Sequence, residues 1–216
     1  MNILLSIVLA ATLWTDSVLF AAYQREDMAV WKEYIDSITN HQSQITNRTL
    51  VYEYGYCGYI VAEAKKEGKE TLLPEAKRYV QQFREHIESL SAKGGLSVER
   101  SKSEAVQQRS GLPLGHYEMY MSAVLVYELR LKISIHPIKA MSLAKEATQM
   151  APDDPLVLSY YGTCLFYAPS PFGSKTDALK WFRRAEPLFD DPQYRFSWVR
   201  EANQMYIRQC LEKLKK

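Results

Sequence analysis

Residues 153–192 constrain the fold of this chain more than any other stretch. Apolar residues recur there at intervals of three and four on both sides of a turn rich in proline and glycine. This spacing predicts two amphipathic helices joined as a hairpin. An Asp-Asp-Pro sequence stands at each end of the stretch, where aspartate caps a helix and proline is tolerated in its first turn. Both aspartate pairs are therefore explained as helix starts, without a catalytic role.

The rest of the chain carries the same helical spacing, and no segment alternates between apolar and polar residues for long enough to predict a β-sheet. Residues 97–110 are polar, and we expect a solvated linker or a short exposed helix there. Gly55 and Gly58 predict the close approach of a neighbouring helix, since glycine otherwise costs about 1 kcal/mol in a helix interior. Helices are predicted over about residues 25–40, 50–66, 74–91, 116–132, 137–150 and 194–216.

Length and composition favour one folded domain. The 216 residues are 47% hydrophobic and 24% charged, as in ordinary globular proteins. The formal net charge is only +2, a balance that predicts neither a nucleic-acid-binding face nor an anionic-membrane-binding surface. Tyrosine is frequent, with 15 copies, and it suits half-buried helix faces as well as binding surfaces.

The N-terminus begins with a strongly apolar run. Residues Asn2 to Trp14 are too few to span a bilayer as a helix, but the run has the length of the apolar core of a signal peptide. We expect cleavage after Ala21, so that residues 1–21 form a signal peptide and residues 22–216 a single exported, periplasmic domain with no membrane span. Two features favour the alternative of a buried N-terminal helix. No Lys or Arg precedes the run, and Asp16 interrupts the approach to the cleavage site.

Neither the cysteines nor the histidines are spaced as metal ligands. Cys57, Cys164 and Cys210 match no metal or redox motif. Cys57 and Cys164 stand beside small residues in apolar helical patterns, where buried free thiols are expected, while the sequence leaves open whether Cys210 meets either of them. The four histidines lie far apart in the chain, and His86, between two glutamates, is expected at the surface. The chain also lacks a glycine-rich phosphate loop and a nucleophile elbow. We therefore expect a non-enzymatic protein without a cofactor or a metal.

Small and large residues follow a pattern in the 153–192 hairpin. Small residues at these positions let two helices approach, and large ones fill the space opposite them. The first helix carries Tyr161, Gly162 and Leu165, the second carries Ala178, Phe182 and Ala185, and Pro192 follows. This pattern resembles the tetratricopeptide repeat, although the turn is longer and the proline comes later.

The preceding hairpin extends the resemblance to about residues 119–216. It carries alanines at matching positions and a proline, Pro152, after its second helix, although Glu128 replaces the usual small residue. The resemblance implies an all-α fold in which antiparallel helix hairpins stack as a short right-handed TPR-like solenoid. The Pro-Phe-Gly turn within 168–173 is also similar to that of helical periplasmic proteins associated with TRAP transporters.

Such a solenoid implies a concave groove lined by the first helix of each hairpin, which repeat proteins commonly use for binding. Its residues are mostly aromatic or neutral, which favours an extended or apolar peptide segment of a protein partner. The alternative function is that of a transporter-associated periplasmic protein holding a small apolar ligand. Alternatively, the same residues fill the interior of the fold. The expected groove residues are Tyr52, Tyr56, Tyr59, Leu125, Leu129, Lys132, Ser159, Thr163, Phe166, Val199, Asn203 and Tyr206.

Overall fold

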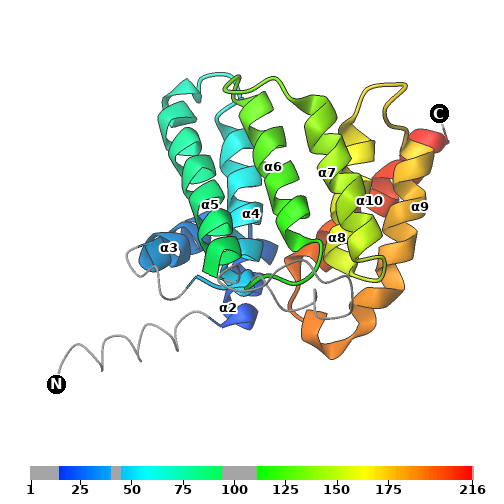
Figure 1. Ribbon diagram of the computed structural model, residues 1–216, viewed down its shortest axis with the longest axis horizontal. Helices are drawn as coiled ribbons and strands as arrows, with labels where there is room; N and C mark the ends of the chain where they lie inside the picture. Colours follow the sequence, from blue (N-terminus) through cyan, green and yellow to red (C-terminus); the bar gives the residue numbers. More distant parts are fainter. Residues whose placement is uncertain (1–14, 40–44, 94–110, 216) are drawn as a thin grey trace, which may run out of the picture.

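The computed structural model describes residues 15–39, 45–93 and 111–215, and every regular element within them is helical (Figure 1). This confirms the all-α prediction, while the polar segment 97–110 lies outside the described residues. No helix in the described ranges is both long and apolar enough to cross a bilayer. The α-helices are α2 (Asp16–Gln24), α3 (Met28–Thr39), α4 (Asn47–Glu63), α5 (Leu73–Lys93), α6 (His116–Arg130), α7 (Pro137–Met150), α8 (Pro155–Tyr167), α9 (Lys175–Ala185) and α10 (Trp198–Leu214).

From α4 onward, helices that are consecutive in the chain are antiparallel neighbours (Figure 1). α4 packs on α5, α6 on α7 and α8 on α9, and each second helix also packs on the first helix of the next pair. The first helices lie side by side as well, since α4 contacts α6, α6 contacts α8 and α8 contacts α10. α2 packs on α3, and α3 packs on α4. The N-terminal helices therefore cover one side of the first pair.

α8 and α9 form the hairpin predicted from residues 153–192. Asp154 caps α8, because its Oδ1 atom accepts hydrogen bonds from the backbone N–H groups of Leu156 and Val157 at 2.9 and 3.2 Å. Gly162 faces Phe182 so closely that a Cβ atom on the glycine would lie 2.8 Å from Cε1 of the ring. The small and large residues of the pattern therefore oppose each other as the sequence predicted.

Buried polar side chains join helices whose pairing is not evident from periodicity. His116 on α6 places Nδ1 2.9 Å from Oδ1 of Asn47 and Nε2 2.9 Å from Oδ2 of Asp154, so it links the starts of α4 and α8. His86 on α5 is only 6% exposed, and its Nδ1 atom lies 2.7 Å from Oε1 of Glu53 on α4. The prediction of a surface position for His86 was wrong, because this face of α5 packs against α4.

The three cysteines are free thiols. Cys57 is buried, as expected, whereas Cys164 is only half-buried, and Cys210, whose state the sequence left open, is buried. Burial raises the pKa of the Cys57 thiol well above its usual value, and the nearby Glu53 raises that pKa further. A thiol held protonated in this way is a poor nucleophile.

α2 belongs to the core of the fold, although the expected cleavage site lies within it. Leu19 and Ala22 are fully buried, and the Leu19 carbonyl accepts a hydrogen bond from Nε1 of Trp31 at 2.8 Å. Asp16 accepts hydrogen bonds from the Tyr52 hydroxyl and from Nε of Arg48, both at 2.8 Å. Cleavage after Ala21 would remove the contacts made by Asp16 and Leu19.

For export as the sequence predicts it, we expect the mature N-terminus to lie before Thr15. Burial of the Leu19 side chain contributes about 1.5–3 kcal/mol, a large share of the stability of a typical domain, and a chain that starts at Ala22 would lose it. N-terminal sequencing of the protein recovered from the periplasm measures the cleavage site directly. Recovery of a stable folded chain starting at Ala22 would show that the fold does not require the first part of α2.

Candidate binding pocket between the α2–α3 turn, α4 and α10

The twelve residues expected to line a groove do not share one accessible surface. Thr163 and Tyr206 are half-buried, while Tyr59, Leu129 and Lys132 are exposed. The remaining seven are buried and cannot offer a surface to a partner. These buried residues are Tyr52, Tyr56, Leu125, Ser159, Phe166, Val199 and Asn203.

Tyr52 and Asn203 show why these side chains lie inside. Tyr52 packs edge-on against Trp31 and Tyr34, with ring centroids 5.2 and 5.5 Å apart, so α3 covers the face of α4 that was expected to be open. Asn203 on α10 is fully buried and donates a hydrogen bond to the carbonyl of Phe182 on α9 at 3.0 Å. The seven buried residues therefore fill the interior of the fold, as the alternative interpretation had it, and belong to no open groove.

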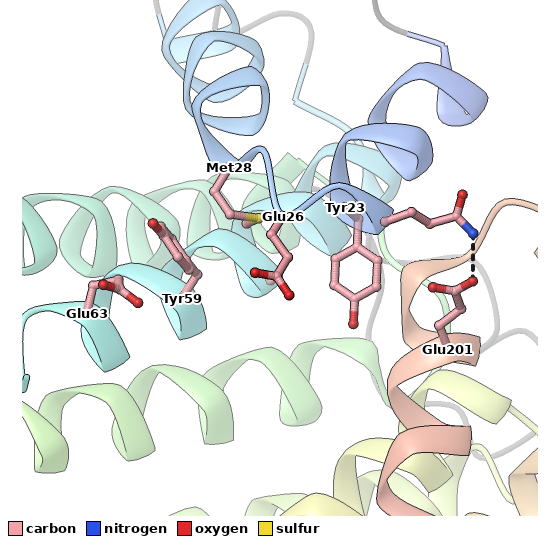
Figure 2. Close-up of a pocket in the computed structure, with 8 residues that line it drawn as sticks. Tyr23, Glu26, Met28, Tyr59, Glu63 and Glu201 are labelled. Carbon is pink, nitrogen blue, oxygen red and sulfur yellow. Dashed lines mark hydrogen bonds between the residues drawn. The ribbon is translucent and has the colours of Figure 1, made fainter.

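A pocket of about 600 Å³ lies between the α2–α3 turn, α4 and α10 (Figure 2). Gly55 forms part of its wall, and a Cβ atom there would lie 2.6 Å from Cζ3 of Trp31 and 2.8 Å from Cζ2 of Trp198. α3, α4 and α10 thus meet around this glycine, which confirms the close approach predicted for Gly55. The pocket is lined by Tyr23, Gln24, Glu26, Met28, Gly55, Tyr59, Glu63 and Glu201.

Carboxylates dominate the polar chemistry of this pocket. Its described lining includes Glu26, Glu63 and Glu201, and none of the lining residues is a lysine, an arginine or a histidine. Glu201 Oε1 accepts a hydrogen bond from Nε2 of Gln24 at 2.9 Å, which joins α10 to α2. Glu63 is paired with Lys66, which follows α4. The pocket therefore presents net negative charge to a ligand.

Two tyrosine rings lie beside these carboxylates. In the view of Figure 2, Glu26 lies between Tyr59 and Tyr23. Burial raises the pKa of both tyrosines, and Glu201 raises that of Tyr23 further while Glu63 raises that of Tyr59. Both hydroxyls therefore stay neutral and can donate hydrogen bonds. Aromatic faces together with carboxylates favour an organic cation, because the ring quadrupole and the negative charge both attract it.

Glu26 has a backbone conformation that favours glycine. Its φ of 58° lies in the left-handed region, just after the C-terminus of α2. The N–H of Asp27 donates to the carbonyl of Ala22 at 2.9 Å, as in the Schellman motif that usually places glycine at this point. A glutamate here is therefore retained at a cost in stability, at the wall of the pocket.

Replacing Glu26 by glycine is expected to raise the free energy of unfolding by about 0.5–1 kcal/mol. The relief of left-handed strain exceeds the entropy that glycine adds to the unfolded chain. Urea unfolding measures the change. Lys132, with a φ of 60° after α6, is the matched control, and Lys132→Gly should give the same gain. A loss of stability in Glu26→Gly but not in Lys132→Gly would show that Glu26 makes a stabilising contact.

Sequence reasoning found only Tyr59 of this pocket. Most of α2 was assigned to the signal peptide, and Glu201 stands in no recognisable motif. The described residues contain no group of three or more His, Cys, Asp or Glu side chains that could hold a metal ion. No protein family model matches the chain, and no curated protein and no solved structure is significantly similar to it.

Proposed function

We propose that this protein is a non-enzymatic, exported binding protein that captures a cationic segment of a protein partner in the pocket between α4 and α10. The observation that carries the proposal is a lining of three carboxylates and two tyrosines, in which only Glu63 has a cationic partner among the described residues, Lys66 from outside the lining. An arginine or lysine side chain suits this lining, because its head faces the carboxylates while its stem packs on the rings. A volume of about 600 Å³ suits such a side chain with its neighbours.

In this proposal the helices form a short TPR-like right-handed solenoid. Two features support that arrangement: α4, α6, α8 and α10 contact one another in turn, and Gly162 opposes Phe182 as in the repeat pattern. α4 and α10 are then the first and last inner helices, and the pocket lies at the mouth of the concave side. The proposed binding site on the concave side is therefore this acidic pocket, and it replaces the apolar groove expected from the sequence.

A small apolar ligand, as expected for a transporter-associated protein, suits the pocket less well. Such a ligand would cover the carboxylates of Glu26 and Glu201 without offering them a cation, and Glu201 would keep only its hydrogen bond from Gln24. Burying an unpaired charge is strongly unfavourable. The acidic lining therefore favours the protein-binding function over this alternative.

Peptide titrations test the proposed preference for a cation. The first probe is a short fluorescein-labelled Gly/Ser peptide with one central arginine, and the matched probe carries citrulline, which keeps the shape and removes the charge. We expect the arginine peptide to bind about tenfold more tightly, since hydrogen bonds to charged groups contribute about 1.5–3 kcal/mol. The variant Glu26→Gln/Glu201→Gln should bind both peptides with the same low affinity.

Glu67→Gln/Glu70→Gln is the control for the titration. It removes the same charge from the α4–α5 connection, outside the pocket lining, and should leave binding unchanged. Equal affinities of the native protein for the two peptides, or full binding by the pocket variant, would overturn the proposed function.

A further inference from the structure

One edge of the molecule collects the connections between the first and second helices of each pair. We call this edge the turn end and define it as residues 64–72, 129–139, 167–175 and 208–215. It comprises the α4–α5, α6–α7 and α8–α9 connections with their flanking residues, and the last turns of α10. Figure 1 shows these segments along the top of the molecule, next to the C-terminus.

Exposed apolar side chains gather at the turn end. Within the described residues, eleven large hydrophobic side chains are exposed, and eight of them belong to it. The most exposed are Ile135 at 83%, Ile138 at 76%, Tyr167 at 67% and Phe172 at 63%. They lie on or directly beside the α6–α7 and α8–α9 connections rather than on one flat helix face. Such a concentration is typical of an interaction surface.

Positive charge gathers on the same segments. The turn end contains ten Lys and Arg residues against three Glu residues. The whole chain has a net charge of only +2, so the rest of the molecule is negative. The small net charge of the whole chain therefore does not reveal this asymmetry, which becomes visible only from the positions of the segments in the fold.

A pair of lysines lies in this positive region where α9 begins and α10 ends. Lys175 at the start of α9 and Lys213 near the end of α10 lie over the ring of Phe166, with Nζ 3.8 and 4.9 Å from its centroid. Neither forms a salt bridge within the described residues, and Lys175 Nζ donates to the Phe166 carbonyl. Burial and the charge of Lys213 both lower the pKa of Lys175. An anionic group placed between the two ammonium groups would relieve their repulsion.

We propose that the turn end docks on the surface of an anionic phospholipid bilayer. Ile135, Ile138 and Phe172 enter the headgroup region, while Lys175 and Lys213 hold lipid phosphates. Apolar side chains on connection tips, interleaved with lysines, fit a lipid surface. Lysine is depleted from protein–protein interfaces, whose apolar core is continuous. The charge and the scattered apolar tips therefore favour lipid over a protein partner. This docking adds a membrane surface to the proposed peptide-binding function and does not depend on it.

Vesicle sedimentation with the full chain tests the proposal. The vesicles are pure phosphatidylcholine or phosphatidylcholine with 30% phosphatidylglycerol. We expect markedly stronger binding to the anionic vesicles than to pure phosphatidylcholine, and we expect salt to weaken this difference. Lys175→Gln/Lys213→Gln should lower the partition coefficient about twenty-five-fold, at about fivefold for each lysine near an anionic surface. Ile135→Ser/Ile138→Ser should lower it about tenfold through lost apolar burial.

Matched controls separate the turn end from the rest of the molecule. Val18→Ser removes an exposed apolar side chain on α2, and Arg183→Gln/Arg195→Gln removes two exposed cations outside the turn end. Both should bind like the native protein. All variants keep the apolar N-terminal run, so binding by that run is common to every protein compared. Equal binding to both kinds of vesicle, or equal losses in the control variants, would overturn the proposal, as would native binding by the turn-end variants.

Discussion

Replacing His86 by leucine is expected to lower the free energy of unfolding by about 3–5 kcal/mol. His86 is the close partner of Glu53, which is only 2% exposed. Without the imidazole, Oε1 of Glu53 would keep only the long hydrogen bond that Nε2 of Gln82 donates to it at 3.4 Å. The second carboxylate oxygen, Oε2, has no hydrogen-bond partner among the described residues even with His86 present. The expected loss is therefore that of a buried acidic group deprived of its partner. Urea unfolding followed by circular dichroism measures it.

A double variant separates this loss from a loss of packing. Glu53→Leu/His86→Leu removes both polar groups and should recover most of the stability, because a matched apolar pair leaves no buried charge. Glu85→Leu, on the exposed side of α5, is the control and should change the free energy of unfolding by less than about 0.5 kcal/mol. If the double variant is as unstable as His86→Leu alone, packing and not charge explains the loss.

Replacing Gly55 by valine is expected to lower the free energy of unfolding by about 2–3 kcal/mol. The added side chain would meet the rings of Trp31 and Trp198, which approach the Cβ position from two different helices. Trp31 is fully buried and is held by its hydrogen bond to the Leu19 carbonyl, so its ring cannot move aside freely. Either α3 or α10 must shift. Thermal unfolding followed by circular dichroism measures the cost.

Gly58→Val is the matched control, since it makes the same change one turn further along α4. Its Cβ atom would meet only Tyr127, at 3.1 Å from the hydroxyl at the end of the side chain. Both variants gain the same helix propensity over glycine, so the difference between them reports the contact with the tryptophans. Equal losses of stability in the two variants would contradict the steric explanation.

Local features of the fold could be predicted because their causes are local. The α8–α9 hairpin follows from apolar spacing, from Asp154 as a cap and from the Gly162–Phe182 contact. Helix bounds differ from expectation mainly at chain turns, as at the start of α10, where a 3-10 helix at Pro192–Tyr194 precedes Trp198. The all-α class depends on such short-range signals.

The candidate pocket could not be predicted in the same way. Gln24 and Glu201 meet across nearly the whole chain, and no local pattern marks that contact. Periodicity showed that Tyr52 lies on an apolar face of α4, but it could not show that α3 covers that face. His86 has polar sequence neighbours, and only the packing of α5 on α4 reveals its buried partner. Each of these errors concerns which helix packs against a given face, and none concerns whether the residues form a helix.

The meeting of α3 with α10 changes how the chain should unfold. In open repeat arrays each unit contacts only its neighbours, and the terminal units fray first. Here the Trp31 and Trp198 rings lie 5.6 Å apart, centroid to centroid, and the Gln24–Glu201 hydrogen bond reinforces that contact. Among the described helices, neither α3 nor α10 can detach without exposing part of this contact to water. We therefore expect α10 to unfold together with the N-terminal helices rather than to fray first, as the end of an open array would.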